Sequence, residues 1–150
     1  MRNIFLILLF ITSMLFAQNL EIISKFFKYD PKEKVSIFKG DVNATKGKDN
    51  IVSDEMYVYF DDNKKPVKFI AIGHVKFILA LDNNATYKGK CDKLIYFIKS
   101  GDIILKGDAF VKKLETNESI SGDIIKMNRF TKDISVQGAK KPVNIIIKVD

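Results

Sequence analysis

The chain has 150 residues, which is the size of one domain and enough to bury a single hydrophobic core. Apolar residues make up 47% of it and charged residues 29%, a balance that excludes an intrinsically disordered protein. The formal net charge of +7 favours anionic partners, but the lysines are spread along the chain and no nucleic-acid-binding module is recognisable, so we expect an anionic lipid or membrane surface and no nucleic acid.

The first segment of the chain differs from the rest. Arg2 is followed by a strongly apolar, uncharged run from Ile4 to Phe16, which is typical of a secretory signal. As a helix this run would span roughly 20 Å, against a bilayer core of about 30 Å. We therefore predict a signal peptide over residues 1–17, cleaved after Ala17, and a mature domain over residues 18–150. The alternative is an uncleaved N-terminal anchor.

The mature chain repeats itself. A glycine follows an apolar approach in four segments at intervals of 31 to 34 residues: IFKGDVNAT at Gly40, IAIGHVKFI at Gly73, ILKGDAFVK at Gly107 and SVQGAKKPV at Gly138. A second recurring segment lies between these glycines, around Asp54, Asp92 and Asp123, with a degenerate first copy around Lys25. The repeating unit is therefore a pair of strands.

Apolar residues in these segments follow a spacing of two, which predicts strands and rejects helical repeats. Turn-forming segments such as DDNKKP and IKSGD separate the runs. We expect an all-antiparallel protein of about a dozen or more strands, with no helix after the signal. One long run places these residues on a single face: Val67, Phe69, Ala71, Gly73, Val75, Phe77 and Leu79.

A glycine at the same place in each long ribbon allows the sheet to bend there. Repeated bends would fold the ribbons over each other, apolar faces inward, into an elongated roll. The two ends of such a roll present unpaired backbone groups that invite strand addition by another chain.

The inward residues of this roll are large and apolar. They form either a plain core or, if the two walls splay apart, a cleft suited to acyl chains. The pattern places these residues inside: Met56, Val58, Phe69, Val75, Phe77, Ile95, Phe97, Ile103, Leu105 and Val111.

Three segments carry a resemblance to a known family. They are a G-[DN]-V strand at Gly40, the LKGDAFV strand at Gly107 and the SGDII segment at Ser121. In their order over about residues 20–149, they resemble the OstA-like domain of LptA-type periplasmic lipopolysaccharide-transport proteins. The family pattern departs at Gly73 and Gly138, where histidine and alanine follow the glycine.

The resemblance implies a single twisted antiparallel β-jellyroll with open edge strands at both ends. It implies a periplasmic carrier and bridge whose interior shields the acyl chains of lipopolysaccharide without catalysis. It adds Val42, Ala44 and Ala109, beside the matching glycines, to the lipid-facing residues.

The resemblance also implies protein partners. An LptC-like protein would pair with the N-terminal edge and an LptD-like protein with the C-terminal edge, where PVNIIIKVD would supply the strand. Two alternatives remain open at this point. One is an LptC-like protein that keeps its N-terminal helix as an anchor, and the other is a structural protein that polymerises head to tail without lipid.

Catalytic chemistry has little support in the residues. His74 is the one histidine and falls on the polar side of its ribbon, and neither a nucleophile set nor a metal-ligand cluster is present, so we expect no metal or cofactor. The lone Cys91 is expected to be a buried strand residue. The repeat should stack its three aspartates, with Lys93 and Lys126 between their charges.

Three asparagines lie in N-x-[ST] acceptor sequences, each with an acidic residue two positions earlier. They are Asn43 in DVNAT, Asn84 in DNNAT and Asn117 in ETNES. The composition predicts roughly 0.1 such extended matches by chance. The excess suggests N-glycosylation after export, with Asn43 the weakest candidate because it follows Gly40 in a predicted strand. The alternative is that polar turns are simply rich in these residues.

Overall fold

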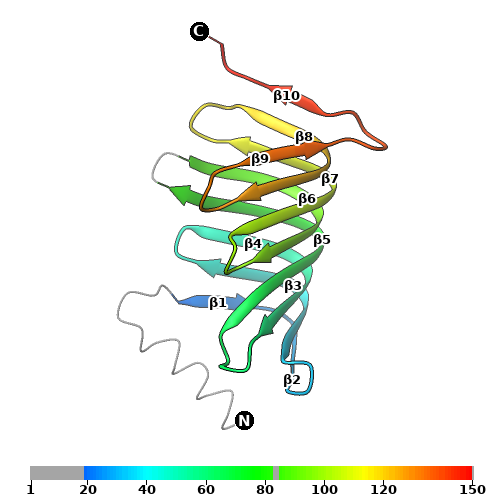
Figure 1. The fold of residues 1–150 in the computed structure, drawn as a ribbon. Coiled ribbons are helices and arrows are strands. Elements are labelled where there is room, and N and C mark those ends of the chain that lie inside the picture. Colours follow the sequence, from blue (N-terminus) through cyan, green and yellow to red (C-terminus); the bar gives the residue numbers. More distant parts are fainter. Residues whose placement is uncertain (1–18, 83–84, 150) are drawn as a thin grey trace.

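The computed structural model describes residues 19–82 and 85–149, and the chain trace appears in Figure 1. The predicted signal peptide and Asn84 lie outside these residues. The described residues contain no helix, and therefore no helix that could cross a membrane. Their strands are β1 (Leu20–Ile23), β2 (Phe26–Asp30), β3 (Val35–Lys46), β4 (Asp49–Phe60), β5 (Pro66–Asp82), β6 (Ala85–Phe97), β7 (Asp102–Lys113), β8 (Ser119–Asn128), β9 (Ile134–Gln137) and β10 (Asn144–Ile146).

All ten of these strands belong to one antiparallel sheet with open edges. Strands β3 to β8 pair in chain order as consecutive hairpins. Turn-forming residues between runs of alternating apolar and polar residues favour this arrangement. At one edge β1 and β2 both pair with β3, and at the other edge β9 and β10 both pair with β8. The all-β jellyroll with two open edges is confirmed. The strands are fewer than about a dozen because the long ribbons continue through their glycines.

Three of the repeated glycines bend their strands. Gly40, Gly73 and Gly107 have φ values of 85°, 86° and 82°, and the residue after each also has a positive φ. The pairing register shifts at each of these sites, as in a β-bulge. Each long strand is thereby folded so that its halves lie in two facing walls. Gly138 does not share this geometry, because β9 ends at Gln137, just before it.

The turns fall into two rows, one at each end of the long strands. We call the first rim the β3–β4 and β7–β8 turns (residues 47–48 and 114–118) together with the strand ends at Asp82 of β5 and Ala85 of β6. We call the second rim the turns that precede β3, β5, β7 and β9 (residues 31–34, 61–65, 98–101 and 129–133). The two rims are the free margins of the two walls.

Side chains of the second recurring segment, the one between the glycines, pack against the bends. A Cβ atom added to Gly73 would lie 2.4 Å from Asp54 Oδ2, and one added to Gly107 would lie 2.3 Å from Asp92 Oδ2. Lys25 occupies the same place against Gly40. The repeat relation is therefore confirmed for the units of Gly40, Gly73 and Gly107, including the degenerate first copy, and these glycines leave room for the side chains.

The counter-charges of this ladder are not the predicted ones. Asp54 contacts His74, and Lys141 forms an ion pair with Asp108, beside the Asp92 and Asp123 carboxylates. Lys93 instead lies opposite Lys106 on the neighbouring strand. The prediction for Lys93 and Lys126 was wrong. Successive residues of a strand point to opposite faces of the sheet, so a lysine close to an aspartate in sequence need not lie beside its carboxylate.

The His74–Asp54 contact makes one prediction about pH. His74 Nδ1 lies 2.8 Å from Asp54 Oδ2, and this hydrogen bond, followed by the charge of Asp54, raises the pKa of His74 above 6.5. A raised folded-state pKa stabilises the fold below the unfolded-state pKa, and this contribution is lost as pH rises through the folded value. Because both side chains are exposed, the effect on stability should be small.

We expect NMR titration of His74 to give a pKa above that of an unstructured histidine. Asp54→Asn should move it back toward the ordinary value. A His74 pKa at or below the ordinary value in the unmodified protein would contradict the contact.

Candidate functional site: the apolar interior and its mouth

The candidate site is the interior between the two walls. Each of the six long strands sends apolar side chains into one continuous buried cluster. The cluster runs across the strands from β3 to β8, so it extends along the whole roll. Partly buried apolar residues continue it at both ends, with Leu20 and Ile22 on β1 and Val136 on β9. An apolar path therefore joins the two open edges.

Eleven of the thirteen residues predicted to face the interior lie in this cluster, each no more than 8% exposed. They are Val42, Ala44, Met56, Val58, Phe69, Val75, Phe77, Ile103, Leu105, Ala109 and Val111. The structure thus brings them together, as a face pattern of period two predicts.

Two of the predicted residues do not face the interior. Ile95 is half-buried and Phe97 is 37% exposed, and neither belongs to the buried cluster. The residues of β6 that belong to the buried cluster are Cys91 and Leu94, three positions apart. The bulge beside Asp92 shifts the alternation by one residue, which turns the following odd-numbered positions outward. The prediction for Ile95 and Phe97 was wrong for this reason.

Sequence reasoning also missed interior residues. Leu94, Ile125 and Met127 are all at most 4% exposed and belong to the cluster. Ile125 and Met127 alternate regularly along β8, so their spacing could have identified them. Leu94 could be identified only once the position of the bulge in β6 was known.

Glycine makes room for the largest side chain of the interior. Phe77 of β5 is 2% exposed, and its Cζ atom would lie 2.5 Å from a Cβ added to Gly89 on β6. The same Cβ would lie 2.2 Å from the carbonyl oxygen of Phe110 on β7. The ring of Phe77 therefore lies over the bare backbone of its neighbour, and the interior is closely packed.

The gap between the two rims is the mouth of the interior, and side chains of the two rims meet across it. Arg129, on the second rim after β8, places a guanidinium nitrogen 3.0 Å from Asp49 Oδ2 at the start of β4 on the first rim. Asp49 Oδ1 also accepts a hydrogen bond from the backbone N–H of Ala80, at 2.9 Å. Three strands of the sheet lie between β4 and β8, so this contact crosses the mouth rather than the wall.

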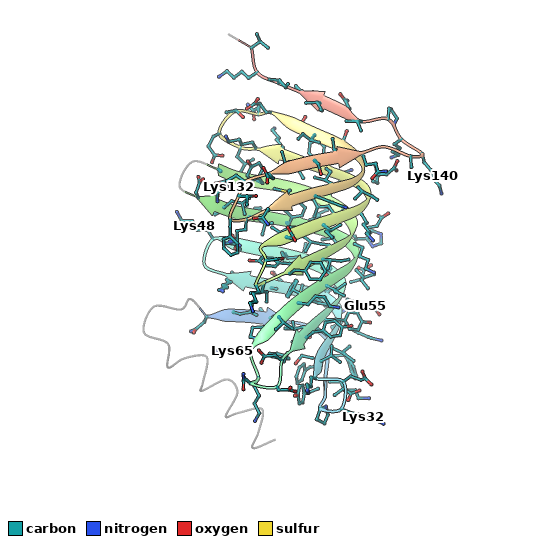
Figure 2. All side chains as sticks on the ribbon, in the orientation of Figure 1. Lys32, Lys48, Glu55, Lys65, Lys132 and Lys140 are labelled. Atoms are coloured by element: carbon teal, nitrogen blue, oxygen red, sulfur yellow. The ribbon has the colours of Figure 1, made fainter. Side chains whose placement is uncertain are left out.

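Lys132 adds a second contact across the mouth. Its ammonium group donates a hydrogen bond to the carbonyl of Leu81, at 2.9 Å, and lies 3.9 Å from an Asp82 carboxylate oxygen. Figure 2 shows Lys132 and Lys48 on the same side of the molecule, where the rims approach each other. We call Arg129, Lys132, Asp49, Leu81 and Asp82 the mouth contacts.

The electrostatics of Arg129 fit a partly enclosed ion pair. Its side chain is 27% exposed and that of Asp49 is 18% exposed. Partial burial lowers the pKa of Arg129, but the charge of Asp49 and the contact with Tyr96 outweigh it and raise the pKa overall. The guanidinium is thus a fixed positive charge held by a fixed partner.

The mouth ion pair should contribute more to stability than an exposed one. Asp49→Asn is expected to reduce the free energy of unfolding by about 1–3 kcal/mol, between the values for exposed and fully buried pairs. Asp41→Asn is a matched control, because Asp41 also pairs at 3.0 Å, with Lys25, but both side chains are more than three-quarters exposed. Urea unfolding of the two variants measures the difference, and equal losses would contradict the enclosed character of the Arg129–Asp49 pair.

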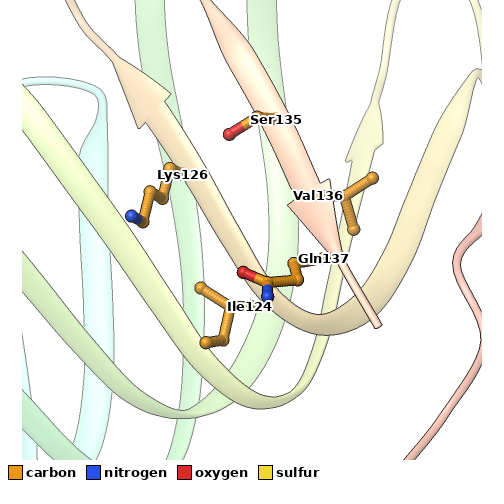
Figure 3. Close-up of a pocket in the computed structure, with 5 residues that line it drawn as sticks. All are labelled: Ile124, Lys126, Ser135, Val136 and Gln137. Carbon is orange, nitrogen blue, oxygen red and sulfur yellow. The ribbon is translucent and has the colours of Figure 1, made fainter. Parts of the chain in front are cut away.

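A pocket of about 300 Å³ lies between β8 and β9 (Figure 3). Its lining comprises Ile124, Lys126, Ser135, Val136 and Gln137. Ile124 and Lys126 alternate along β8 with the inward residues Ile125 and Met127. Val136, by contrast, packs against the buried cluster, so the pocket lies at the C-terminal edge, next to the end of the interior.

The described residues offer no assembled catalytic or metal site. Burial, followed by the charge of Asp92, raises the pKa of the Cys91 thiol to about 12, so this thiol stays protonated and unreactive. Its predicted place as a buried strand residue is confirmed. Across residues 19–82 and 85–149, no group of three or more His, Cys, Asp or Glu side chains could hold a metal ion.

Comparison with known proteins agrees with this architecture. The family described as "LptA/(LptD N-terminal domain) LPS transport protein" matches residues 21–133. The crystal structure of LptH from Pseudomonas aeruginosa, the LptA homologous periplasmic component of its lipopolysaccharide transport device, superposes with a TM-score of 0.77. The two share 16% sequence identity, over 88% of this chain and 96% of that one. Curated protein sequences include no significant match.

Proposed function

Because the chain belongs to the LptA/LptD N-terminal domain family of lipopolysaccharide transport proteins, we propose that it is a periplasmic carrier that shields lipopolysaccharide acyl chains in its interior. The family is one of transport proteins rather than enzymes. The same proposal makes the protein a bridge that passes lipopolysaccharide from the inner to the outer membrane.

The continuous apolar interior is the observation that carries this proposal. Acyl chains need a surface that is apolar along its length and sheltered from water. The buried cluster offers such a surface from β3 to β8. The outer face of the roll does not, because it is exposed and carries many lysines. The interior is filled by its own side chains, so acyl chains would have to separate the walls.

We expect the walls to separate at the mouth contacts. The sheet is continuous around the bend, whereas the rims are joined through side chains. Breaking an ion pair and a few hydrogen bonds costs less than breaking a ladder between strands. Lipid entry between the rims would therefore leave the sheet intact.

The two open edges support the bridging part of the proposal. At the C-terminal edge, Ile145 and Ile146 of β10 are 51% and 57% exposed, and at the other edge Ile23 of β1 is 59% exposed. An exposed apolar edge strand is a template for strand addition. We propose that an LptC-like protein pairs with the β1 edge and an LptD-like protein with the β10 edge, or a second copy of this chain with either.

Photo-crosslinking tests the carrier function. A photoreactive phenylalanine analogue at Phe77, inside the roll, should form adducts with lipopolysaccharide in cells. The same analogue at Ile78 is the matched control, because Ile78 is the next residue of β5 and is 36% exposed on the outer face. Adducts to protein alone at Phe77, or equal lipopolysaccharide adducts at both positions, would reject the carrier and favour a structural polymer.

Separate measurements test location and partners. The protein should be recovered in the soluble periplasmic fraction, and recovery in the inner-membrane fraction would favour an anchored, LptC-like component. Crosslinkers at Ile23 and Ile145 should capture different proteins if the two edges bind different partners. Capture of this chain alone at both edges would instead favour a head-to-tail homo-oligomer.

A further inference from the structure

The hairpin between β7 and β8 carries a sequence feature that lipid transport does not explain. Residues 115–119 read Glu-Thr-Asn-Glu-Ser, which is an N-x-[ST] acceptor with an acidic residue two positions before the asparagine. Asn117 lies in the turn of this hairpin (residues 114–118), on the first rim. We propose that Asn117 is N-glycosylated after export.

The conformation of the turn presents Asn117 to solvent. Asn117 is exposed and has a φ of 62°, a left-handed conformation that asparagine tolerates better than most residues. Its backbone N–H donates to the carbonyl of Lys113 at 2.8 Å, and the N–H of Lys113 donates to Glu118 at 2.8 Å. The Asn117 carboxamide makes no hydrogen bond within the described part of the chain. The acceptor nitrogen is therefore unoccupied on an exposed residue of a defined turn.

The acidic residue of the acceptor sequence is held in place by the neighbouring hairpin. Glu115 Oε1 accepts a hydrogen bond from the backbone N–H of Thr86 on β6 at 2.8 Å, and the N–H of Leu114 donates to the carbonyl of Thr86 at 2.9 Å. The hydrogen bond from Thr86 lowers the pKa of Glu115, so its carboxylate remains charged. These contacts fix the first residues of the turn and leave the Asn117 carboxamide without a hydrogen bond to the other described residues.

Asn43 has the same sequence pattern but a different structure. It lies within β3, opposite Ile23 of β1 on one side and Val52 of β4 on the other. Its side-chain oxygen also accepts a hydrogen bond from Asn50 at 2.7 Å. A residue paired on both sides in a sheet cannot leave the strand without breaking the ladder, so folded Asn43 should remain unmodified.

The modification is a glycosyl transfer. The Asn117 amide nitrogen forms a bond to the anomeric carbon of an oligosaccharide carried on a lipid diphosphate. The bond between that carbon and the diphosphate oxygen breaks, the lipid diphosphate leaves, and one amide proton passes to a base of the transferase. Nothing is oxidised or reduced. The product carries a bulky, polar group on the first rim.

Mass spectrometry of the protein isolated from its native host tests the proposal. The peptide that contains Asn117 should carry a glycan mass, and the peptide that contains Asn43 should not. Asn117→Gln and Ser119→Ala should each remove that mass completely, whereas Ser119→Thr should retain it and shows that the fold is intact. A bare Asn117 peptide in the native protein would overturn the proposal.

Asn63 provides a matched control within the same protein. It lies in the exposed β4–β5 turn with Asp61 two residues before it, but Lys65 rather than serine or threonine two residues after it. Asn63→Gln should leave the glycan mass unchanged. A loss of mass in this variant would show that the acceptor sequence at Asn117 does not direct the modification. The readout is independent of lipid binding, so its failure would leave the carrier proposal standing.

Discussion

Leu105→Asp is expected to prevent folding of the mature domain. Leu105 of β7 is fully buried. Its pairing partners on the neighbouring strands, Leu94 of β6 and Ile125 of β8, are also fully buried. A carboxylate at this position would have no charged or hydrogen-bonding partner, and burying an unpaired charge costs several kcal/mol. That loss is comparable with the whole stability of a domain, about 5–15 kcal/mol. Far-UV circular dichroism should show loss of the β-sheet signal.

Two variants separate burial from proximity to the bend. Leu105→Ala keeps the site apolar and should reduce the free energy of unfolding by about 2–5 kcal/mol through the cavity it leaves. Lys106→Asp changes the adjacent residue, which is exposed on the opposite face, and should change stability by less than about 0.5 kcal/mol. If Lys106→Asp were as harmful as Leu105→Asp, the assignment of the two faces would be wrong.

Gly107→Val is expected to cause the second largest loss, because it acts on both the backbone and the packing of the bend. A β-branched residue at a φ of 82° costs about 1–3 kcal/mol from conformation alone. The new Cβ would also lie 2.8 Å from the Cβ of Asp92, closer than two such atoms approach. Urea unfolding should show a loss above that range of about 1–3 kcal/mol, since the packing term adds to the conformational one.

A short series can separate the two causes. Gly107→Asn keeps the contact with Asp92 but tolerates a positive φ, and should therefore lose less stability than Gly107→Val. Adding Asp92→Gly to Gly107→Val should recover the packing term only. No recovery in the double variant would mean that backbone conformation alone makes glycine necessary there.

The sequence Lys-Gly-Asp occurs twice in the chain, at residues 39–41 and 106–108. Lys106 and Asp108 are exposed, whereas Leu105 and Ala109 on either side are buried. The phrase therefore marks a bend, and its functional neighbours are the inward residues that precede and follow it. We expect substitutions of Lys106 or Asp108 to leave crosslinking from Phe77 unchanged.

The repeat and its alternation could be predicted from the sequence because both are local. Phe69, Ala71, Val75, Phe77 and Leu79 form one face of β5, since the spacing across Gly73 is even. The glycines at 40, 73 and 107 were identifiable as bends because a strand without a side chain at that point is free to curve. Antiparallel pairing followed from the turns between the runs.

Tertiary structure alone decided how the alternation continues on the partner strands. At each bend two residues of the glycine strand lie opposite one aspartate, so β6 passes from Cys91 to Leu94 in an odd step while β5 passes from Ala71 to Val75 in an even one. Which strand carries the extra residue depends on the pairing partner, and a single strand's sequence does not record its partner. Ile95 and Phe97 therefore face outward although their spacing suggests otherwise.

The contacts that close the mouth of the interior could not be predicted from the local sequence pattern either. Arg129 and Asp49 are 80 residues apart, and β8, which Arg129 follows, is not a neighbour of β4 in the sheet. They meet only because the accumulated bend and twist of the intervening strands bring the two rims together. Local composition determined an all-β chain with repeated bends and an apolar inner face, since strand pattern and turns depend on adjacent residues. The closure of that face required the whole roll, because its contacts depend on the summed geometry of every strand between them.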